Sequence, residues 1–332
     1  MQGTFSAMFI SVVITAYNRK EYLANAVRSV LNQDINSNNF EILIIKNFKE
    51  QFVDSLKQHT NIQIINTDDS TLGQYYSLAL KFSKGDVLSF LDDDDLFTSD
   101  KLSRLENIFK DHPSLIYYRN SSLTSKGSIQ ELSISDYKGR VYYKKTRFYS
   151  SMEVIEKGIR SLQWNMSCIT VRKNILLGYE EAISRIIGAP DLTIFYIAAT
   201  HKGHFCLDQS VLTIRNINSN SAMSHLGKDN DFVRESKSLD SILLYINQKD
   251  LLRDLEKTKI RIRMLSALMG SEIDDKELRD LLLRYLKLGI LNINDFKAVL
   301  FLYYLNGMRL ILNCRHFRVT GMIYRLIRDL FI

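Results

Sequence analysis

The stretch Gly85 to Asp95, GDVLSFLDDDD, decides the fold. Its apolar residues predict a short buried strand, and this strand runs directly into four aspartates, Asp92, Asp93, Asp94 and Asp95. Carboxylates this close repel one another, and a divalent cation such as Mn²⁺ or Mg²⁺ relieves the repulsion. The alternative is a solvated acidic turn that caps the next helix. The preceding strand weighs against that alternative, because ligands of open α/β sheets sit at the carboxyl ends of strands.

The composition indicates a globular protein with anionic partners. The chain has 332 residues, 45% of them hydrophobic and only two prolines, which is enough for one large core and a smaller second one. It has 44 Lys and Arg against 37 Asp and Glu, for a net charge of +7. This basic excess suits nucleotides, phospholipid surfaces or nucleic acid. Nucleic acid is the least favoured, because no RNA-binding motif interleaves basic and aromatic residues.

Cysteine usage and hydropathy bear on the compartment. Cys168, Cys206 and Cys314 are odd in number and lie outside any CxxC spacing, which argues against a disulfide framework or a zinc site. Neither a standard signal peptide nor an apolar run of spanning length is evident. We therefore expect a cytoplasmic protein.

Strands alternate with helices over the first third of the chain. Apolar runs at 9–16, 40–45 and 61–65 predict strands, and the spacing at 72–84 predicts a helix that leads into Gly85. Asn18 and Glu21 have the spacing of a capping box for a helix after the first strand. Alternation of this kind predicts a mostly parallel, Rossmann-like sheet with helices on both faces.

These segments together are similar to the family 2 glycosyltransferases. The resemblance is carried by ITAYNR at the end of the first strand, FEI opening the second, a Leu-Gly turn before a helix, and KGDVLSFLDDDD, and it covers about residues 9–225. It implies a GT-A fold, a nucleotide-diphosphate sugar as donor and inverting, metal-dependent transfer to an acceptor hydroxyl of a glycan or lipid-linked saccharide.

The resemblance also assigns residues to the donor site. It implies that Asp92 and Asp94 hold the metal, and that Arg215 contacts the diphosphate. The other substrate-binding positions that we infer are Thr15, Ala16, Tyr17, Arg19, Asn47, Gly73, Asp92, Asp93 and Trp164. Trp164 has a second interpretation as a core residue, since a single tryptophan is more often buried than exposed to a sugar.

Two positions depart from the family pattern. The family's Asp-Asp-Gly-Ser turn is replaced by Lys46, Asn47, Phe48 and Lys49, so the carboxylate that reads the base is absent. Asn47 still offers a donor and an acceptor, and Lys46 or Lys49 suits a phosphate, while the alternative is a loop that only packs. The motif's histidine falls on Ile217; His225, Asn218 and Asn220 are weak substitutes.

Asp191 is the candidate general base. It follows Pro190, which takes the place of the first acidic residue of the family's Glu-Asp pair, and a helical run comes after it. One carboxylate must accept the proton of the acceptor hydroxyl. The alternative interpretation is a helix N-cap, and both readings can hold at once.

The region from 229 to 332 is expected to form a helical C-terminal domain, after a GT-A-like domain at 1–228. Predicted helices span 232–245, 251–269, 275–288 and 295–312. The segment 314–332 has the pattern of a basic amphipathic helix, which suits peripheral contact with an anionic membrane or packing on neighbouring helices. A non-catalytic binding or scaffolding relative is the alternative function, because two family residues are missing.

Overall fold

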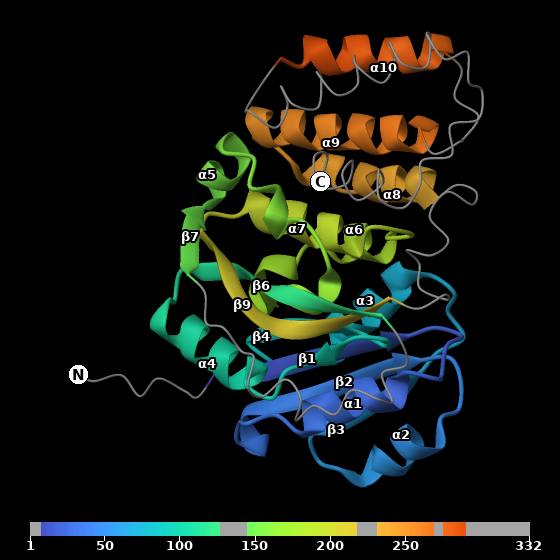
Figure 1. Cartoon of the computed structure of the whole chain (residues 1–332), viewed down its shortest axis with the longest axis vertical. Helices are drawn as coiled ribbons and strands as arrows, with labels where there is room; N and C mark the ends of the chain where they lie inside the picture. Colours follow the sequence, from blue (N-terminus) through green and yellow to red (C-terminus); the bar gives the residue numbers. More distant parts are fainter. Residues whose placement is uncertain (1–7, 127–144, 218–230, 269–274, 290–332) are drawn as a thin grey trace.

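The structure is a computed structural model that describes residues 8–126, 145–217, 231–268 and 275–289. Its centre is a nine-stranded sheet in the order β3-β2-β1-β4-β8-β6-β9-β5, with β7 paired to β9 (Figure 1). The strands are β1 (Ile10–Ala16), β2 (Phe40–Lys46), β3 (Ile62–Asn66), β4 (Val87–Asp92), β5 (Leu96–Phe97), β6 (Leu115–Lys126), β7 (Thr146–Ser150), β8 (Ile169–Arg172) and β9 (His204–Ile217).

The first four strands form the parallel half of the sheet. β1 pairs with β2 and β4, and β2 pairs with β3, all in parallel, so the predicted Rossmann-like half is confirmed. β8 is antiparallel to both β4 and β6, and β5 and β7 are antiparallel to β9. The sheet is mixed because it contains these antiparallel pairs. They join segments that are far apart in sequence.

Helices cover both faces of the sheet. They are α1 (Leu23–Leu31), α2 (Gln51–Ser55), α3 (Leu72–Phe82), α4 (Lys101–Asp111), α5 (Ser151–Glu156), α6 (Glu180–Ser184) and α7 (Pro190–Thr200). The buried side chains of α1, α2 and α4 share one hydrophobic core with the sheet, and those of α3, α5, α6 and α7 belong to the core on the opposite face. The expectation of two covered faces is confirmed.

The predicted capping box at Asn18 and Glu21 is wrong. Helix α1 has Tyr22 at its N-cap, and no side chain caps it. Asn18 instead adopts a positive φ of 54° in the loop after β1. Tertiary contacts of that loop, given below, override the local capping pattern.

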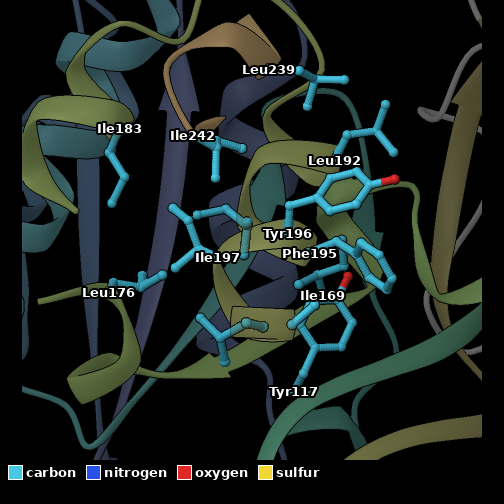
Figure 2. Packing of buried hydrophobic residues seen from close by; sticks show 14 of the residues in the cluster. Tyr117, Ile169, Leu176, Ile183, Leu192, Phe195, Tyr196, Ile197, Leu239 and Ile242 are labelled. Carbon is cyan, nitrogen blue, oxygen red and sulfur yellow. The ribbon is translucent and has the colours of Figure 1, made fainter. Parts of the chain in front are cut away.

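Helix α7 lies at the centre of the second core. Its residues from Leu192 to Ala199 are all buried, as expected for a helix enclosed by other elements. Figure 2 shows α7 side chains, Phe195 and Tyr196 among them, grouped with Tyr117 of β6 and with Leu239 of α8 (Asp231–Asp240). One core therefore runs from the sheet through α7 into the C-terminal helices.

The C-terminal helices α8, α9 (Lys249–Leu268) and α10 (Asp275–Lys287) are stacked beyond α7 (Figure 1). A buried ion pair joins α9 to the rest: the Arg160 guanidinium lies 2.8 Å from Asp254 Oδ1, and Tyr196 donates to Asp254 Oδ2 at 2.8 Å. The helical region is thus tied to the 3₁₀ turn Arg160–Leu162 by an ion pair, and to α7 by a hydrogen bond and apolar packing.

The C-terminal predictions are confirmed in part. Helices occur where the patterns at 251–269 and 275–288 predict them, but the predicted helix at 232–245 ends at Asp240 and continues as a 3₁₀ turn at Leu243–Tyr245. The predicted helices at 295–312 and 314–332 lie outside the described residues, as do Asn218, Asn220 and His225. None of the helices described here is long and apolar enough to cross a bilayer.

Candidate active site

Sheet register brings the predicted site residues to one edge. Thr15 is paired with Asp92 of β4, Ala16 is paired with Lys46 of β2, and Lys46 is paired with Asn66 of β3. The loops that leave these strands therefore emerge side by side, as parallel strands require. Ala16 is buried and packs in the core, so its side chain does not reach this edge.

The loops after β1 and β2 are joined by two asparagines. The Asn18 main-chain N–H donates to Asn47 Oδ1 at 2.8 Å, and Asn47 Nδ2 donates to Asn18 Oδ1 at 2.7 Å. The Lys46 ammonium is fully buried; it lies 2.9 Å from Asp54 and donates to Asn66 Oδ1 at 3.0 Å. Lys46 therefore stabilises the loop from inside and does not face a ligand.

Arg19 forms ion pairs with the acidic stretch. Its guanidinium contacts both oxygens of Asp93 and lies 2.9 Å from Asp94 Oδ2. These contacts and the burial of the guanidinium act in opposite directions, and the net result raises the pKa of Arg19. The residue predicted to bind the nucleoside thus also compensates the acidic stretch.

The aspartates are crowded and largely withdrawn from solvent. Burial, reinforced by the neighbouring carboxylates, raises the pKa of Asp92 well above its ordinary value. Burial likewise raises the pKa of Asp93 to about 6, although Arg19 opposes the shift, and that of Asp95 to about 7. Such shifts mark a site with excess negative charge.

The acidic stretch has the donor chemistry for a divalent cation. Carboxylate oxygens are the ligands that Mg²⁺ and Mn²⁺ prefer, and Arg19 offsets only part of the charge. In the part of the chain that the structure describes, no three His, Cys, Asp or Glu side chains converge as a protein-only metal site. A cation here would therefore need further oxygens from water or from a bound ligand.

An aromatic pair lies beside this edge. Tyr17 is 45% exposed, and its ring meets that of Tyr75 edge to face, with centroids 6.2 Å apart. Tyr75, on α3, is buried, and its hydroxyl has no hydrogen-bond partner among the described residues. Tyr17 therefore presents an open aromatic surface next to the asparagine-joined loops.

Asp191 lies in the first turn of α7, so the N-cap prediction is wrong: the N-cap is Ala189, with a positive φ of 45°. Asp191 Oδ2 accepts the Asn165 main-chain N–H at 3.0 Å, and Oδ1 accepts that of Leu192 at 2.9 Å. Burial raises the pKa of Asp191, and these N–H donors and Arg215 oppose the rise. A carboxylate of raised pKa has the proton affinity that a general base needs.

Arg215 links the two halves of the site. Its guanidinium lies over the Trp164 ring, 5.2 Å from the centroid. Its charge opposes part of the rise in the pKa of Asp191 and of Asp95, so it lies within electrostatic reach of each. Trp164 is half-buried, and one of its faces carries the arginine.

Gly73 lies at the start of α3, where the helix packs on α6. Its N–H donates to the Ile186 carbonyl at 2.8 Å, and a Cβ added there would stand 2.3 Å from the Ser184 carbonyl oxygen. Close packing of α3 on α6 therefore accounts for the glycine without a substrate.

The sequence did not predict the unusual backbone conformations at the site. Among the residues that the structure describes, three other than glycine have a positive φ: Asn18, Asn165 and Ala189. All three adjoin the predicted site residues, and unusual backbone conformations often gather at functional sites. No local pattern marks them, because each depends on contacts with distant segments.

Comparison with known proteins agrees with this geometry. A family model described as glycosyl transferase family 2 matches residues 11–159. An uncharacterized glycosyltransferase of Rickettsia bellii is 28% identical over 142 residues, which is 41% of this chain and 20% of the relative. The Staphylococcus aureus poly(ribitol-phosphate) beta-N-acetylglucosaminyltransferase TarS is 24% identical over 113 residues, 32% of this chain and 20% of that protein.

A solved structure extends the likeness in fold. Residues 1–349 of Staphylococcus aureus TarS in complex with UDP superpose with a TM-score of 0.61 at 14% identity, covering 90% of this chain and 87% of that one. At this identity the likeness establishes the fold, which is of the GT-A type that the sequence predicts. Residues 11–159 of this chain are thus similar to glycosyl transferase family 2, and the fold is similar to that of TarS over most of the chain.

Proposed function

We propose that this protein transfers a sugar from a nucleotide-diphosphate donor, with UDP as the first candidate nucleotide, to an acceptor hydroxyl with inversion. The observation that carries the proposal is that one short segment joins Asp92 and Asp191: the Asp92 N–H donates to Ser167 Oγ at 3.0 Å, and Asp191 Oδ2 accepts the Asn165 N–H at 3.0 Å. An enzyme of this class needs an anion-binding centre and a base facing each other.

The donor is proposed to bind at the edge formed by β1, β2 and β4. Tyr17 and the joined Asn18 and Asn47 would flank the nucleoside, and Arg215 would donate to the diphosphate. UDP is favoured because the structurally similar TarS fragment binds it.

A divalent cation, Mn²⁺ or Mg²⁺, is proposed to be held by Asp92 and Asp94. When bound, it would supply positive charge against the diphosphate that leaves. Asp94 is ion-paired with Arg19, so the same carboxylate has a counter-ion before the donor arrives. Arg19 would keep Asp93 oriented throughout.

Asp191 is proposed to take the proton of the acceptor hydroxyl. The hydroxyl oxygen then forms its bond to the anomeric carbon while the bond from that carbon to the diphosphate oxygen breaks, and the nucleoside diphosphate leaves with the electron pair. Because attack comes from the face opposite the leaving group, the anomeric configuration inverts. Burial favours the protonation of Asp191 that this step requires.

The acceptor is proposed to be a hydroxyl of a glycan or a lipid-linked saccharide, and the name of TarS adds a polyol phosphate polymer to the candidates. The net charge of +7 suits such anionic acceptors. It also suits peripheral contact of 314–332 with an anionic membrane, at the proposed cytoplasmic location.

A non-catalytic role is the second candidate. It is favoured by one observation: the Asn47 carboxamide is engaged at both ends by Asn18, in the loop where the family's base-reading carboxylate would stand. A relative without donor recognition would keep the fold and bind no nucleotide sugar.

Calorimetric titration with UDP-, GDP- and dTDP-linked sugars, in Mn²⁺ and again in EDTA, separates these functions. Metal-dependent binding to one nucleotide supports the transferase. Asp94→Asn should then abolish metal-dependent turnover, and Asp191→Asn should keep donor binding and lose transfer. If folded protein binds none of these nucleotide sugars, the non-catalytic role is favoured.

A further inference from the structure

Asn165 has the least ordinary backbone of the described site. Its φ is 78° and its ψ is 104°, which lies outside the left-handed helical region that asparagine sometimes occupies. The residue follows Trp164 and precedes the short 3₁₀ turn Met166–Cys168 that leads into β8. A conformation of this kind persists only where other contacts hold it.

The side chain of Asn165 does not explain this conformation. Its Oδ1 is buried and has no hydrogen-bond partner among the residues that the structure describes. An Asx-type bond from the side chain to the nearby backbone, the common reason for asparagine at such a position, is therefore not made at this oxygen.

The main chain of Asn165 does make a specific contact. Its N–H donates to Asp191 Oδ2 at 3.0 Å, across 26 positions of sequence. The other oxygen of Asp191 is held by Leu192 N–H, from the same helix turn. Among the hydrogen bonds of the described residues, the Asn165 bond is therefore the one that fixes the carboxylate relative to a segment outside α7.

We propose that Asn165 is a positioning residue for Asp191, acting through the N–H that its positive φ directs at the carboxylate. This inference rests on the proposed function only in taking Asp191 as the base. Asparagine stands there because it tolerates a positive φ better than other residues with a Cβ.

Three further groups face Asp191 and bear on its titration. They are Arg215 from β9, Tyr76 from α3 and Tyr117 from β6. Of these only Arg215 carries a charge near neutral pH, and it favours the carboxylate. Loss of the Asn165 bond removes a donor to the charged form, so the pKa of Asp191 should rise.

The test compares Asn165→Gly with Asn165→Ala. Glycine adopts the backbone freely and lacks the side chain, whereas alanine resists a positive φ and disturbs the N–H. The pKa of Asp191 is measured by carboxyl-carbon NMR in metal-free protein, with Asp191→Asn identifying the signal. We expect the glycine variant to match the wild type within 0.3 pH units and the alanine variant to titrate at least 0.5 units higher.

Transfer kinetics give the second readout. The glycine variant should keep kcat within about twofold, and the alanine variant should lose about tenfold in kcat with its KM for the donor unchanged. Equal effects in both variants, or none in either, would overturn the proposal. If the alanine variant does not fold, a shifted pKa in the glycine variant alone would overturn it, and an unshifted one supports it.

The two readouts also separate this inference from the proposed function. The NMR titration needs no substrate, so it reports on the Asn165 contact even in a protein without transferase activity. A protein that transfers no sugar while showing the expected titrations would refute the proposed function and leave the contact in place.

Discussion

Asn18 and Asn47 exchange two hydrogen bonds, of 2.8 and 2.7 Å, and so join the loops that follow β1 and β2. In the family that this chain resembles, a carboxylate at the second position reads the base. Here the amide is committed to the neighbouring loop, so its contribution to the proposed nucleotide site is to hold the two loops together.

Breaking this link should weaken nucleotide binding more than it weakens the fold. Asn47→Ala removes both bonds, at a cost of about 1 kcal/mol in the free energy of unfolding because the residues are partly exposed. We expect UDP affinity to fall about tenfold by calorimetry, since the loops must then be ordered on binding. Asn38→Ala, at an exposed position of the 3₁₀ turn Ser37–Asn39, is the control. Unchanged affinity would remove Asn47 from the site.

Arg19 should act as the counter-ion of the acidic stretch in the absence of metal. Arg19→Met leaves Asp93 and Asp94 without the guanidinium, and we expect a loss of about 1–3 kcal/mol in EDTA, since the pair is only partly buried. Added Mn²⁺ should then raise the melting temperature of the variant more than that of the wild type.

The control for Arg19 is Arg28→Met, because Arg28 lies over the Phe52 ring rather than in the acidic stretch. Equal Mn²⁺-induced shifts in wild type and Arg19→Met would contradict a metal site at these carboxylates.

The acidic stretch should give an unusual dependence of stability on pH. The pKa of Asp95 is raised to about 7 in the folded protein, above the ordinary value of 3.8. The folded state therefore binds more protons than the unfolded state between these values, and stability contributed by Asp95 falls as pH rises through that window.

Thermal melts in EDTA at pH 5 and pH 8 check this expectation. Asp95→Asn should raise the melting temperature at pH 8 relative to the wild type and change it little at pH 5. Asp111→Asn, at the exposed end of α4, should have the same small effect at both pH values. A uniform effect of Asp95→Asn across the range would argue against the raised pKa.

Substitution of Gly73 tests whether this residue packs against α6 or contacts a substrate. A Cβ there would meet the backbone carbonyls of Ser184 and Ile183 at 2.3 and 2.6 Å, so Gly73→Ala should destabilise the protein by about 1–3 kcal/mol although alanine favours helices. Ser77→Ala in the same helix is the control. Lost UDP affinity with an unchanged melting temperature would instead indicate a direct contact.

The parallel half of the fold was predictable because its strands are continuous apolar runs. The runs at 9–16, 40–45 and 61–65 match β1, β2 and β3 to within one residue. The other half was not, since β6 and β9 pair in parallel across some ninety positions and neither segment has a clear period. The acidic stretch and Asp191 were identified by chemistry and motif.

The supporting residues of the site escaped prediction for a different reason. Asn165 contributes a main-chain N–H, and any residue except proline has one. Asn18 has the spacing of a helix-capping residue. In the structure it bonds to Asn47 instead, and this bonding competes with capping. Such roles are set by tertiary position, which a local pattern does not encode.

The buried Arg160–Asp254 pair changes how the protein can be divided. A cut at residue 228, where the composition changes, would remove Asp254. Arg160 and Tyr196 would then lose their contacts with this carboxylate and become exposed to water. Since Tyr196 and Asp191 share α7, the truncated half would lose the support of the helix that carries the base. Anyone exchanging the helical region among such proteins would have to transplant α9 together with the segment it holds.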